Sequence, residues 1–224
     1  MKLLLFGLIL IYTNYLICQE SNSKFYKQYK SFKCTKEVSK ARAKFCRTES
    51  TCKNGDSSII VKDLKENRII KEEYFSKNKP IGVWKSFDSK KRNYTLRDFS
   101  NIKYFSNISE EEKKAFLNFK NDSTKKIVLA NYNRSNEDFN TYLSKRIKYP
   151  KEVFKNGIEG KVYISFFIEK NGAIDLQYII KGANPYLDFE AWKVLKNMPK
   201  WNPAIIDDKP VKSLYTLPIS FILL

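Results

Sequence analysis

The chain has 224 residues, of which 42% are hydrophobic, and carries a formal net charge of +18. That length and hydrophobic content can form the core of one large domain or of two small ones. The sequence contains no histidine, which excludes Ser-His and Cys-His catalysis as well as His-ligated zinc. We expect no cofactor, no metal and no enzymatic activity, because the adjacent carboxylates Asp207-Asp208 and the Glu110–Glu112 run are typical of a loop and of a helix start.

Residues 1–18 are predicted to be a signal peptide or a short membrane anchor. One lysine precedes about fifteen mostly apolar residues, fewer than the roughly 20 that a membrane-spanning helix needs. Three fates follow from this pattern: cleavage before Gln19, lipidation of Cys18, or retention as an uncleaved anchor. Each of them takes the rest of the chain out of the cytoplasm.

Residues 19–56 are predicted to be a basic and helical segment with cysteines. The stretch 19–135 carries 28 Lys and Arg against 14 Asp and Glu, and its early lysines recur about every third residue. On a helix this spacing spreads the lysines around the cylinder instead of forming one stripe. We therefore expect a solvated surface that does not bind nucleic acid, with attraction to an anionic membrane surface as the alternative use of the charge.

Three cysteines follow the first segment, namely Cys34, Cys46 and Cys52. In an oxidising compartment two of them are expected to form a disulfide, which would leave one free thiol.

Residues 57–108 are predicted to form β-hairpins. Short β-rich runs are broken at Glu66-Asn67 and at Asn78-Lys79-Pro80. The part KEEYFSKNKPIGVWKSFD resembles one unit of the MORN-like repeats; the alternative is a small β-meander with Trp84 in its core. A helix opened by Ser109 and a connecting segment should fill residues 109–136, with a short strand at Ile127–Leu129 and the domain boundary after them.

Residues 137–224 give the clearest pattern. Short helices are predicted over Phe139–Ile147 and Lys151–Lys155, and a longer one should start at Asn184-Pro185. Its apolar stripe is Leu187, Ala191, Val194, Leu195 and Met198. A strand with Val162, Ile164, Phe166 and Ile168 on one face should turn at Lys170-Asn171-Gly172 and pair Ile168 with Ile174, Phe166 with Leu176, Ile164 with Tyr178 and Val162 with Ile180.

The last strand is expected to run from Val211 to Ile222 at a sheet edge. Pro218 lacks the N–H donor that pairing on both sides would require. An edge strand leaves backbone groups available to another chain.

The motifs GIEGKV at 157–162, KNMPKWNPA at 196–204 and YTLPISF at 215–221, with Tyr149-Pro150, Asn184-Pro185 and KPV at 209–211, resemble the TonB C-terminal domain. The resemblance covers residues 137–224 and implies an α+β fold, in which a small antiparallel sheet of about three strands is packed by two helices. Members of this family add the TonB box, an extended peptide of an outer-membrane transporter, to an edge strand. The candidate partner-binding residues are therefore Val211, Lys212, Ser213, Leu214, Tyr215, Thr216 and Leu217.

The resemblance implies a periplasmic protein of transmembrane transport, either exported or anchored to the inner membrane. Its partners would be an outer-membrane TonB-dependent transporter and an inner-membrane proton-channel complex that supplies energy. The family's anchor commonly carries a histidine and is followed by a proline-rich spacer, and this chain has no histidine and only Pro80 before Pro150. The alternative is an exported, non-energised protein that uses the same module to bind another envelope partner.

Overall fold

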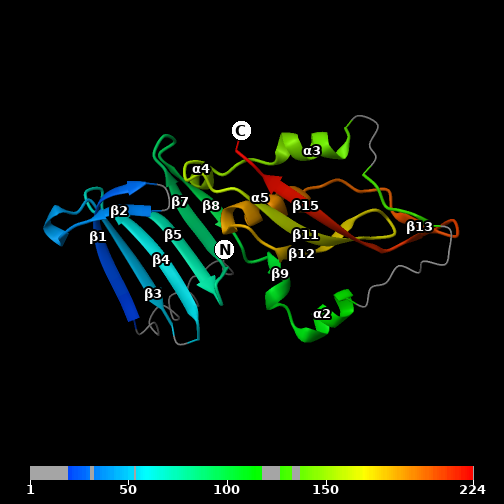
Figure 1. The fold of residues 1–224 in the computed structure, drawn as a ribbon, viewed down its shortest axis with the longest axis horizontal. Helices are drawn as coiled ribbons and strands as arrows, with labels where there is room; N and C mark the ends of the chain where they lie inside the picture. The colour runs from blue at the N-terminus through cyan, green and yellow to red at the C-terminus, as the bar shows by residue number, and fades with distance from the viewer. Residues whose placement is uncertain (1–19, 31–32, 53, 118–126, 133–136, 224) are drawn as a thin grey trace, which may run out of the picture. The chain divides into compact units, whose positions relative to one another are not determined.

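The computed structural model describes residues 20–30, 33–52, 54–117, 127–132 and 137–223 (Figure 1). The chain divides into two compact units, Met1–Ser100 and Asn101–Leu224. The three fates predicted for residues 1–18 lie outside the described residues. Among the helices within those ranges, none is long and apolar enough to span a membrane.

The first unit is a β-sheet unit, as the predicted β-rich region requires. Its sheet has eight strands in the order β2-β1-β3-β4-β5-β7-β8, with β6 paired to β5. The strands are β1 (Glu20–Lys30), β2 (Lys33–Glu37), β3 (Phe45–Thr51), β4 (Asp56–Asp63), β5 (Arg68–Ser76), β6 (Lys79–Pro80), β7 (Val83–Asp88) and β8 (Asn93–Asp98), and a single 3-10 turn, η1, covers Lys40–Arg42.

The prediction of a helix over residues 19–56 is wrong, because this segment forms β1, β2 and β3. Phe25 pairs with Cys46 and Tyr26 with Phe45 in an antiparallel ladder. The lysine spacing was compatible with a solvated helix, but aromatic residues also favour strands, and pairing with a distant segment decided between the two.

Trp84 lies in the core of the first unit, as the β-meander interpretation predicts. Its side chain is 2% exposed, and its indole N–H donates to the Tyr74 carbonyl at 2.9 Å. The rings of Phe75 and Phe99 lie 4.9 and 4.7 Å from it, between centroids. The resemblance of this region to a MORN-like unit stays a prediction.

The cysteines of the first unit have different states. Cys46 is a free thiol, and Cys52 is disulfide-bonded. The β1–β2 ladder places Cys34 opposite Tyr29, whereas Thr51, next to Cys52, pairs with Glu20. Those two levels are nine residues apart along β1, or about 30 Å, so a Cys34–Cys52 bond does not fit this sheet. The fourth cysteine of the sequence, Cys18, lies outside the described residues.

The second unit has an α+β fold, which confirms the predicted fold class. One sheet has the order β15-β11-β12-β9, and a smaller one has the order β10-β13-β14. The elements are β9 (Lys103–Tyr104), η2 (Phe105–Asn107), α2 (Glu110–Leu117), β10 (Ile127–Val128), α3 (Phe139–Arg146), α4 (Lys151–Phe154), β11 (Gly160–Ile168), β12 (Ile174–Lys181), α5 (Pro185–Lys196), β13 (Ala204–Ile206), β14 (Lys209–Val211) and β15 (Ser213–Phe221).

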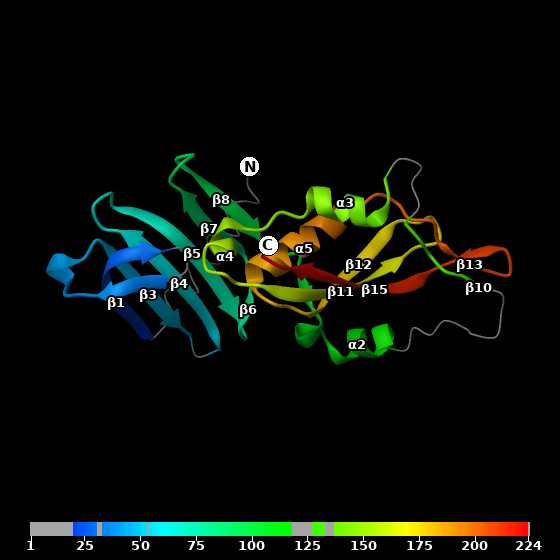
Figure 2. The same ribbon diagram turned by 45° about the horizontal axis from the view of Figure 1, so that its top comes forward.

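The core of the second unit lies between α5 and the four-stranded sheet (Figure 2). Asn184 caps α5 by accepting from the Tyr186 N–H at 3.0 Å, and Pro185 takes the first helical position, as predicted. Every residue of the predicted apolar stripe is buried, although α5 ends at Lys196 and Met198 lies just past it. The predicted inward face of β11 is also confirmed, because Val162, Ile164, Phe166 and Ile168 are 0% exposed.

The predicted hairpin register is correct at the turn and wrong beyond it. Gly172 has a left-handed conformation, with φ of 79°, and Ile168 pairs with Ile174. An irregularity between Phe166 and Phe167 then shifts the ladder by one residue, so that Phe166 pairs with Gln177 and Ile164 with Ile179. Such a bulge leaves no trace in the apolar alternation of a strand that is buried on both faces.

The domain boundary predicted near residue 136 is also displaced. The second unit begins at Asn101, because β9 pairs in parallel with β12. The Tyr104 hydroxyl donates to the Asp188 Oδ2 at 3.1 Å, and Asp188 also accepts from the Ala183 N–H at 2.9 Å. Burial of Tyr104, together with the charge of Asp188, raises the pKa of its phenol far above the usual value. Residues 101–108 are thus an integral part of this fold.

Candidate strand-addition site

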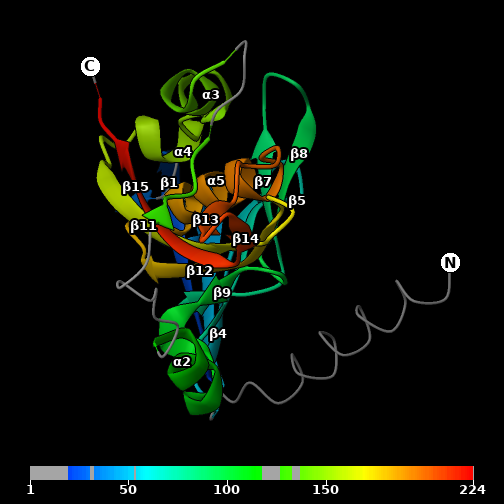
Figure 3. The same ribbon diagram turned by 90° about the vertical axis from the view of Figure 1, so that its right-hand side faces the viewer.

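Strand β15 is the exposed edge of the four-stranded sheet. It pairs with β11 along its whole length and stands last in the strand order, while β9 occupies the opposite edge beside β12. Figure 3 shows β15 in red and β9 in green at the two ends of this sheet. The fold therefore covers part of one edge, at Tyr178 and Ile179, with its own chain and leaves β15 without a second paired strand among the described residues.

The predicted partner-binding residues fall on two elements. Val211 ends β14, where it pairs with Ala204 in the smaller sheet, and Lys212 forms an ion pair with Glu169 between the two strands. Ser213, Leu214, Tyr215, Thr216 and Leu217 form the first half of β15. The single strand expected from Val211 to Ile222 is therefore divided, because β14 pairs with β13 in the smaller sheet and β15 pairs with β11 from Ser213 onward.

The direction of the backbone groups of β15 follows from two observations. Pro218 stands opposite Tyr163 in an uninterrupted antiparallel ladder, and because proline has no N–H this pair belongs to the non-hydrogen-bonded type. Two residues earlier, the hydroxyls of Ser165 and Thr216 approach to 2.7 Å, as the closer side chains of that pair type allow. The N–H and C=O groups of Leu214, Thr216 and Ser220, and the C=O of Pro218, hence point away from β11.

Aromatic side chains line the α5 side of the first half of β15. Tyr215 is 36% exposed, and its ring centroid lies 4.9 Å from that of Trp201 and 5.7 Å from that of Phe166. Trp201 also contacts Phe139 and Tyr132, at 5.5 and 5.9 Å between centroids. Tyr215 is thus a partly exposed ring that packs against other rings. We call the rings of Trp201, Phe166, Phe139 and Tyr132 the aromatic support.

The other side of the same half is apolar as well. Phe167 and Tyr178 form a buried cluster, and Phe105, Ile108 and Leu214 pack against it. Phe105 and Ile108 belong to the segment 101–108, which lies outside the domain that the sequence predicts over residues 137–224. Their local sequence carries no motif, and only the gathering of apolar residues at 102, 104, 105 and 108 could have drawn attention to them.

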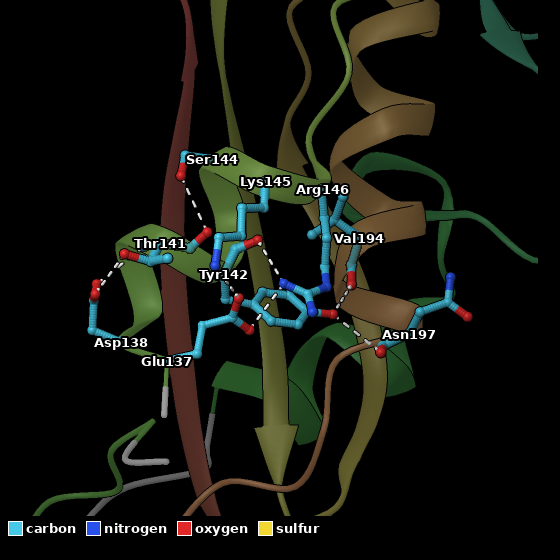
Figure 4. Close-up of polar contacts among 9 residues, drawn as sticks. All are labelled: Glu137, Asp138, Thr141, Tyr142, Ser144, Lys145, Arg146, Val194 and Asn197. Atoms are coloured by element: carbon cyan, nitrogen blue, oxygen red, sulfur yellow. Dashed lines mark hydrogen bonds and ion pairs between the residues drawn. The ribbon is translucent and has the colours of Figure 1, made fainter. Parts of the chain in front are cut away.

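Helix α3 is fixed beside this aromatic support by polar contacts (Figure 4). Asp138 caps it by accepting from the Thr141 N–H at 3.0 Å. The Tyr142 hydroxyl donates to the carbonyl of Asn197, at 3.1 Å, just past the end of α5. The guanidinium of Arg146 lies 4.0 Å from the centroid of the Tyr142 ring and donates to Glu137 at 2.9 Å.

The charges at α3 perturb the ionisation of its acidic residues. The hydrogen bond from Arg146 lowers the pKa of Glu137, and Lys145 adds to this effect. Hydrogen bonds from the side chain and backbone of Thr141 lower the pKa of Asp138. Both carboxylates are structural, because each one holds an end of α3.

Within the described ranges, no group of three or more Cys, Asp or Glu residues could hold a metal ion. The arrangement at β15 offers backbone donors and acceptors flanked by apolar side chains. Those are the features that bind an extended peptide.

Comparison with known proteins gives one match, which covers the carboxy-terminal part of the chain. Residues 145–223 match the family model described as Gram-negative bacterial TonB protein C-terminal. No curated protein and no solved structure matches the chain. The matched range contains α4, β11, β12, α5, β13, β14 and β15 in order and starts at the end of α3. Residues 145–223 of this chain are therefore a domain of the TonB C-terminal family.

Proposed function

We propose that this chain is a TonB-like protein of the cell envelope that binds an extended segment of an outer-membrane transporter by strand addition to β15. The TonB C-terminal domain supports a transport-related role, since this family consists of non-enzymatic transducers. The observation that carries the proposal is the edge position of β15, whose second side has no paired strand among the described residues. Backbone pairing at such an edge supplies affinity with little demand on the partner's sequence.

We propose that this binding transmits energy from an inner-membrane proton-driven motor to the transporter. It requires that the chain stay attached to the inner membrane and contact a proton-channel complex. The second candidate function is a non-energised binding protein released into the periplasm, which the lack of histidine and of a proline-rich spacer favours. Both candidates use the same edge of the sheet.

A proline at Thr216 tests the edge assignment. The Thr216 N–H points outward, so Thr216→Pro removes a donor for the partner strand and keeps the ladder with β11. We expect it to weaken binding about tenfold or more, because the partner loses one backbone hydrogen bond and its strand meets the proline ring. The measurement is calorimetric titration with synthetic peptides, each copied from the amino-terminal periplasmic segment of an outer-membrane transporter of the same cell.

Thr216→Ala is the matched control, because it removes the hydroxyl that contacts Ser165 and keeps the N–H. We expect this variant to bind within about twofold of the unchanged chain. Equal affinity of the proline variant and the alanine variant, with both folded, would refute strand addition at β15.

Intact mass and membrane fractionation separate the two candidate functions. A chain that begins at Met1 and stays in the inner membrane supports the energy transducer. A shortened chain that is free in the periplasm supports the non-energised binding protein, and a lipid mass on Cys18 makes it a tethered form of the same.

A further inference from the structure

The outward donors of β15 form an interrupted row. Leu214 and Thr216 present two N–H groups that are two residues apart, or about 7 Å along the strand. The next residue of the same parity is Pro218, which has a carbonyl and no N–H. The following outward N–H belongs to Ser220, about 14 Å beyond Thr216.

The two halves of β15 also differ in the side chains beside the edge. The first half has the partly exposed ring of Tyr215 on one side and Leu214, with Phe105 and Ile108, on the other. In the second half the apolar residues Ile219 and Phe221 are each only 2% exposed. Pro218 and Ser220, the residues exposed there, offer a partner little apolar surface.

A partner residue opposite Tyr215 would sit in a non-hydrogen-bonded pair, because the backbone groups of Tyr215 face β11. Side chains approach each other most closely in such pairs. The Tyr215 ring would therefore contact the side chain of that partner residue directly. The same short stretch of β15 thus offers a partner strand two kinds of contact: backbone hydrogen bonds from the neighbours of Tyr215 and apolar contact from Tyr215 itself.

We infer, on the basis of the proposed function, that Pro218 ends the partner-binding edge and confines strand addition to Ser213–Leu217. The partner strand is short, about five residues long, with its hydrogen bonds to Leu214 and Thr216 and its central side chain beside Tyr215. Beyond Pro218 the partner chain leaves the sheet. Pro218 also prevents β15 from presenting a long edge to other strands, as prolines at sheet edges do.

Amide hydrogen exchange of the full chain, measured by NMR, tests the direction of the donors before any partner is added. We expect slow exchange at Tyr215, Leu217 and Ile219 and fast exchange at Leu214, Thr216 and Ser220. On addition of a transporter peptide that binds the unchanged chain, the amides of Leu214 and Thr216 should become protected and that of Ser220 should not. Equal protection of Thr216 and Ser220 would overturn the inference.

Two substitutions test the limit at Pro218 by titration with the same peptide. Ser220→Pro removes an outward donor in the same way as Thr216→Pro but beyond the proposed limit, so we expect affinity within about twofold of the unchanged chain. Pro218→Ala restores the missing donor, and we expect about threefold to tenfold tighter binding together with protection of Ser220.

The outcomes distinguish this inference from the function on which it rests. If no transporter peptide binds the unchanged chain, the proposed function fails. If a peptide binds and Ser220→Pro weakens it as much as Thr216→Pro, the function stands and the limit at Pro218 is wrong. Unchanged affinity in a folded Pro218→Ala variant would likewise overturn the limit.

Discussion

Two glycines with left-handed backbone show how the consequence of a residue depends on its surroundings. Gly157, after α4, has φ of 64° and no atom within 4 Å of where a Cβ would stand. Gly172, in the β11–β12 turn, has φ of 79°, and a Cβ there would lie 2.0 Å from the Trp201 carbonyl oxygen. The backbone N–H of Trp201 also donates to the Gly172 carbonyl at 2.8 Å. The turn and the aromatic support are therefore linked by a backbone hydrogen bond.

We therefore predict unequal costs for the two alanine substitutions. Gly157→Ala should lower the free energy of unfolding by about 1 kcal/mol, the cost of a left-handed alanine. Gly172→Ala should lower it by about 3 kcal/mol or more, because the clash with Trp201 adds to the same strain. Urea denaturation of both variants checks this, and similar midpoints would contradict the close approach of the turn to Trp201.

The cysteines give a second prediction at this scale. Alkylation of the folded, unreduced protein should label Cys46 and leave Cys52 unlabelled, because Cys46 is a free thiol and Cys52 is disulfide-bonded. Peptide mapping by mass spectrometry then identifies the partner of Cys52. A Cys46–Cys52 peptide would contradict the free thiol of Cys46, and a Cys34–Cys52 peptide would contradict the strand register of the first sheet. A Cys18–Cys52 peptide would require that any export cleavage leave Cys18 on the chain.

At the scale of elements, α3 depends on ionised carboxylates. Because the folded-state pKa of Glu137 is lowered, this group contributes stability above its ordinary pKa, near pH 4, and the contribution is lost as the pH falls through the lowered value. The same sign holds for Asp138. The contacts of α3 should therefore loosen in acid and stay intact at neutral pH.

NMR titration of Glu137 tests this dependence. Arg146→Gln should raise the pKa of Glu137 back toward its ordinary value, because the hydrogen bond from Arg146 is the largest cause of the lowering. Lys145→Gln is the matched control and should raise that pKa less, since Lys145 lies 3.4 Å from Glu137 and contributes less. Equal shifts in the two variants would show that general positive charge, and not the Arg146 contact, sets this pKa.

The elements that the sequence predicted well are those with local signals. The Asn184-Pro185 start and the apolar stripe determine α5 through capping and side-chain spacing. The segment 19–56 forms strands instead of the predicted helix because β1 pairs with β3, at separations in sequence from 19 residues (Tyr26–Phe45) to 31 residues (Glu20–Thr51). Strand propensity depends on such partners more than helix propensity does.

At the scale of the whole molecule, the stable unit should be larger than the matched family range. Residues 101–108 close the β12 edge and bury Tyr104 against Asp188. We predict that a fragment of residues 101–224 is more stable than one of residues 109–224 by at least about 3 kcal/mol, the sum of one charge-assisted hydrogen bond and the burial of Tyr104, Phe105 and Ile108.

Thermal and urea unfolding of the two fragments checks this prediction. Tyr104→Phe in the longer fragment isolates the hydrogen bond to Asp188, and we expect it to cost about 1.5–3 kcal/mol. Equal stability of the two fragments would mean that β9 and η2 rest on the sheet without stabilising it.

Local signals in the sequence are enough to predict most of the carboxy-terminal module. Its glycines, caps and apolar alternation are local signals, and they specified α5, the turn at Gly172 and an edge strand marked by Pro218. Three features depend on contacts in the folded chain: residues 19–56 are strands, β11 and β12 shift by one residue, and residues 101–108 cover part of the second edge. Capping and side-chain periodicity act within a few residues of the chain, so the sequence shows them directly. Strand pairing and burial join segments that are separated in sequence, and no local pattern identifies the partner segment.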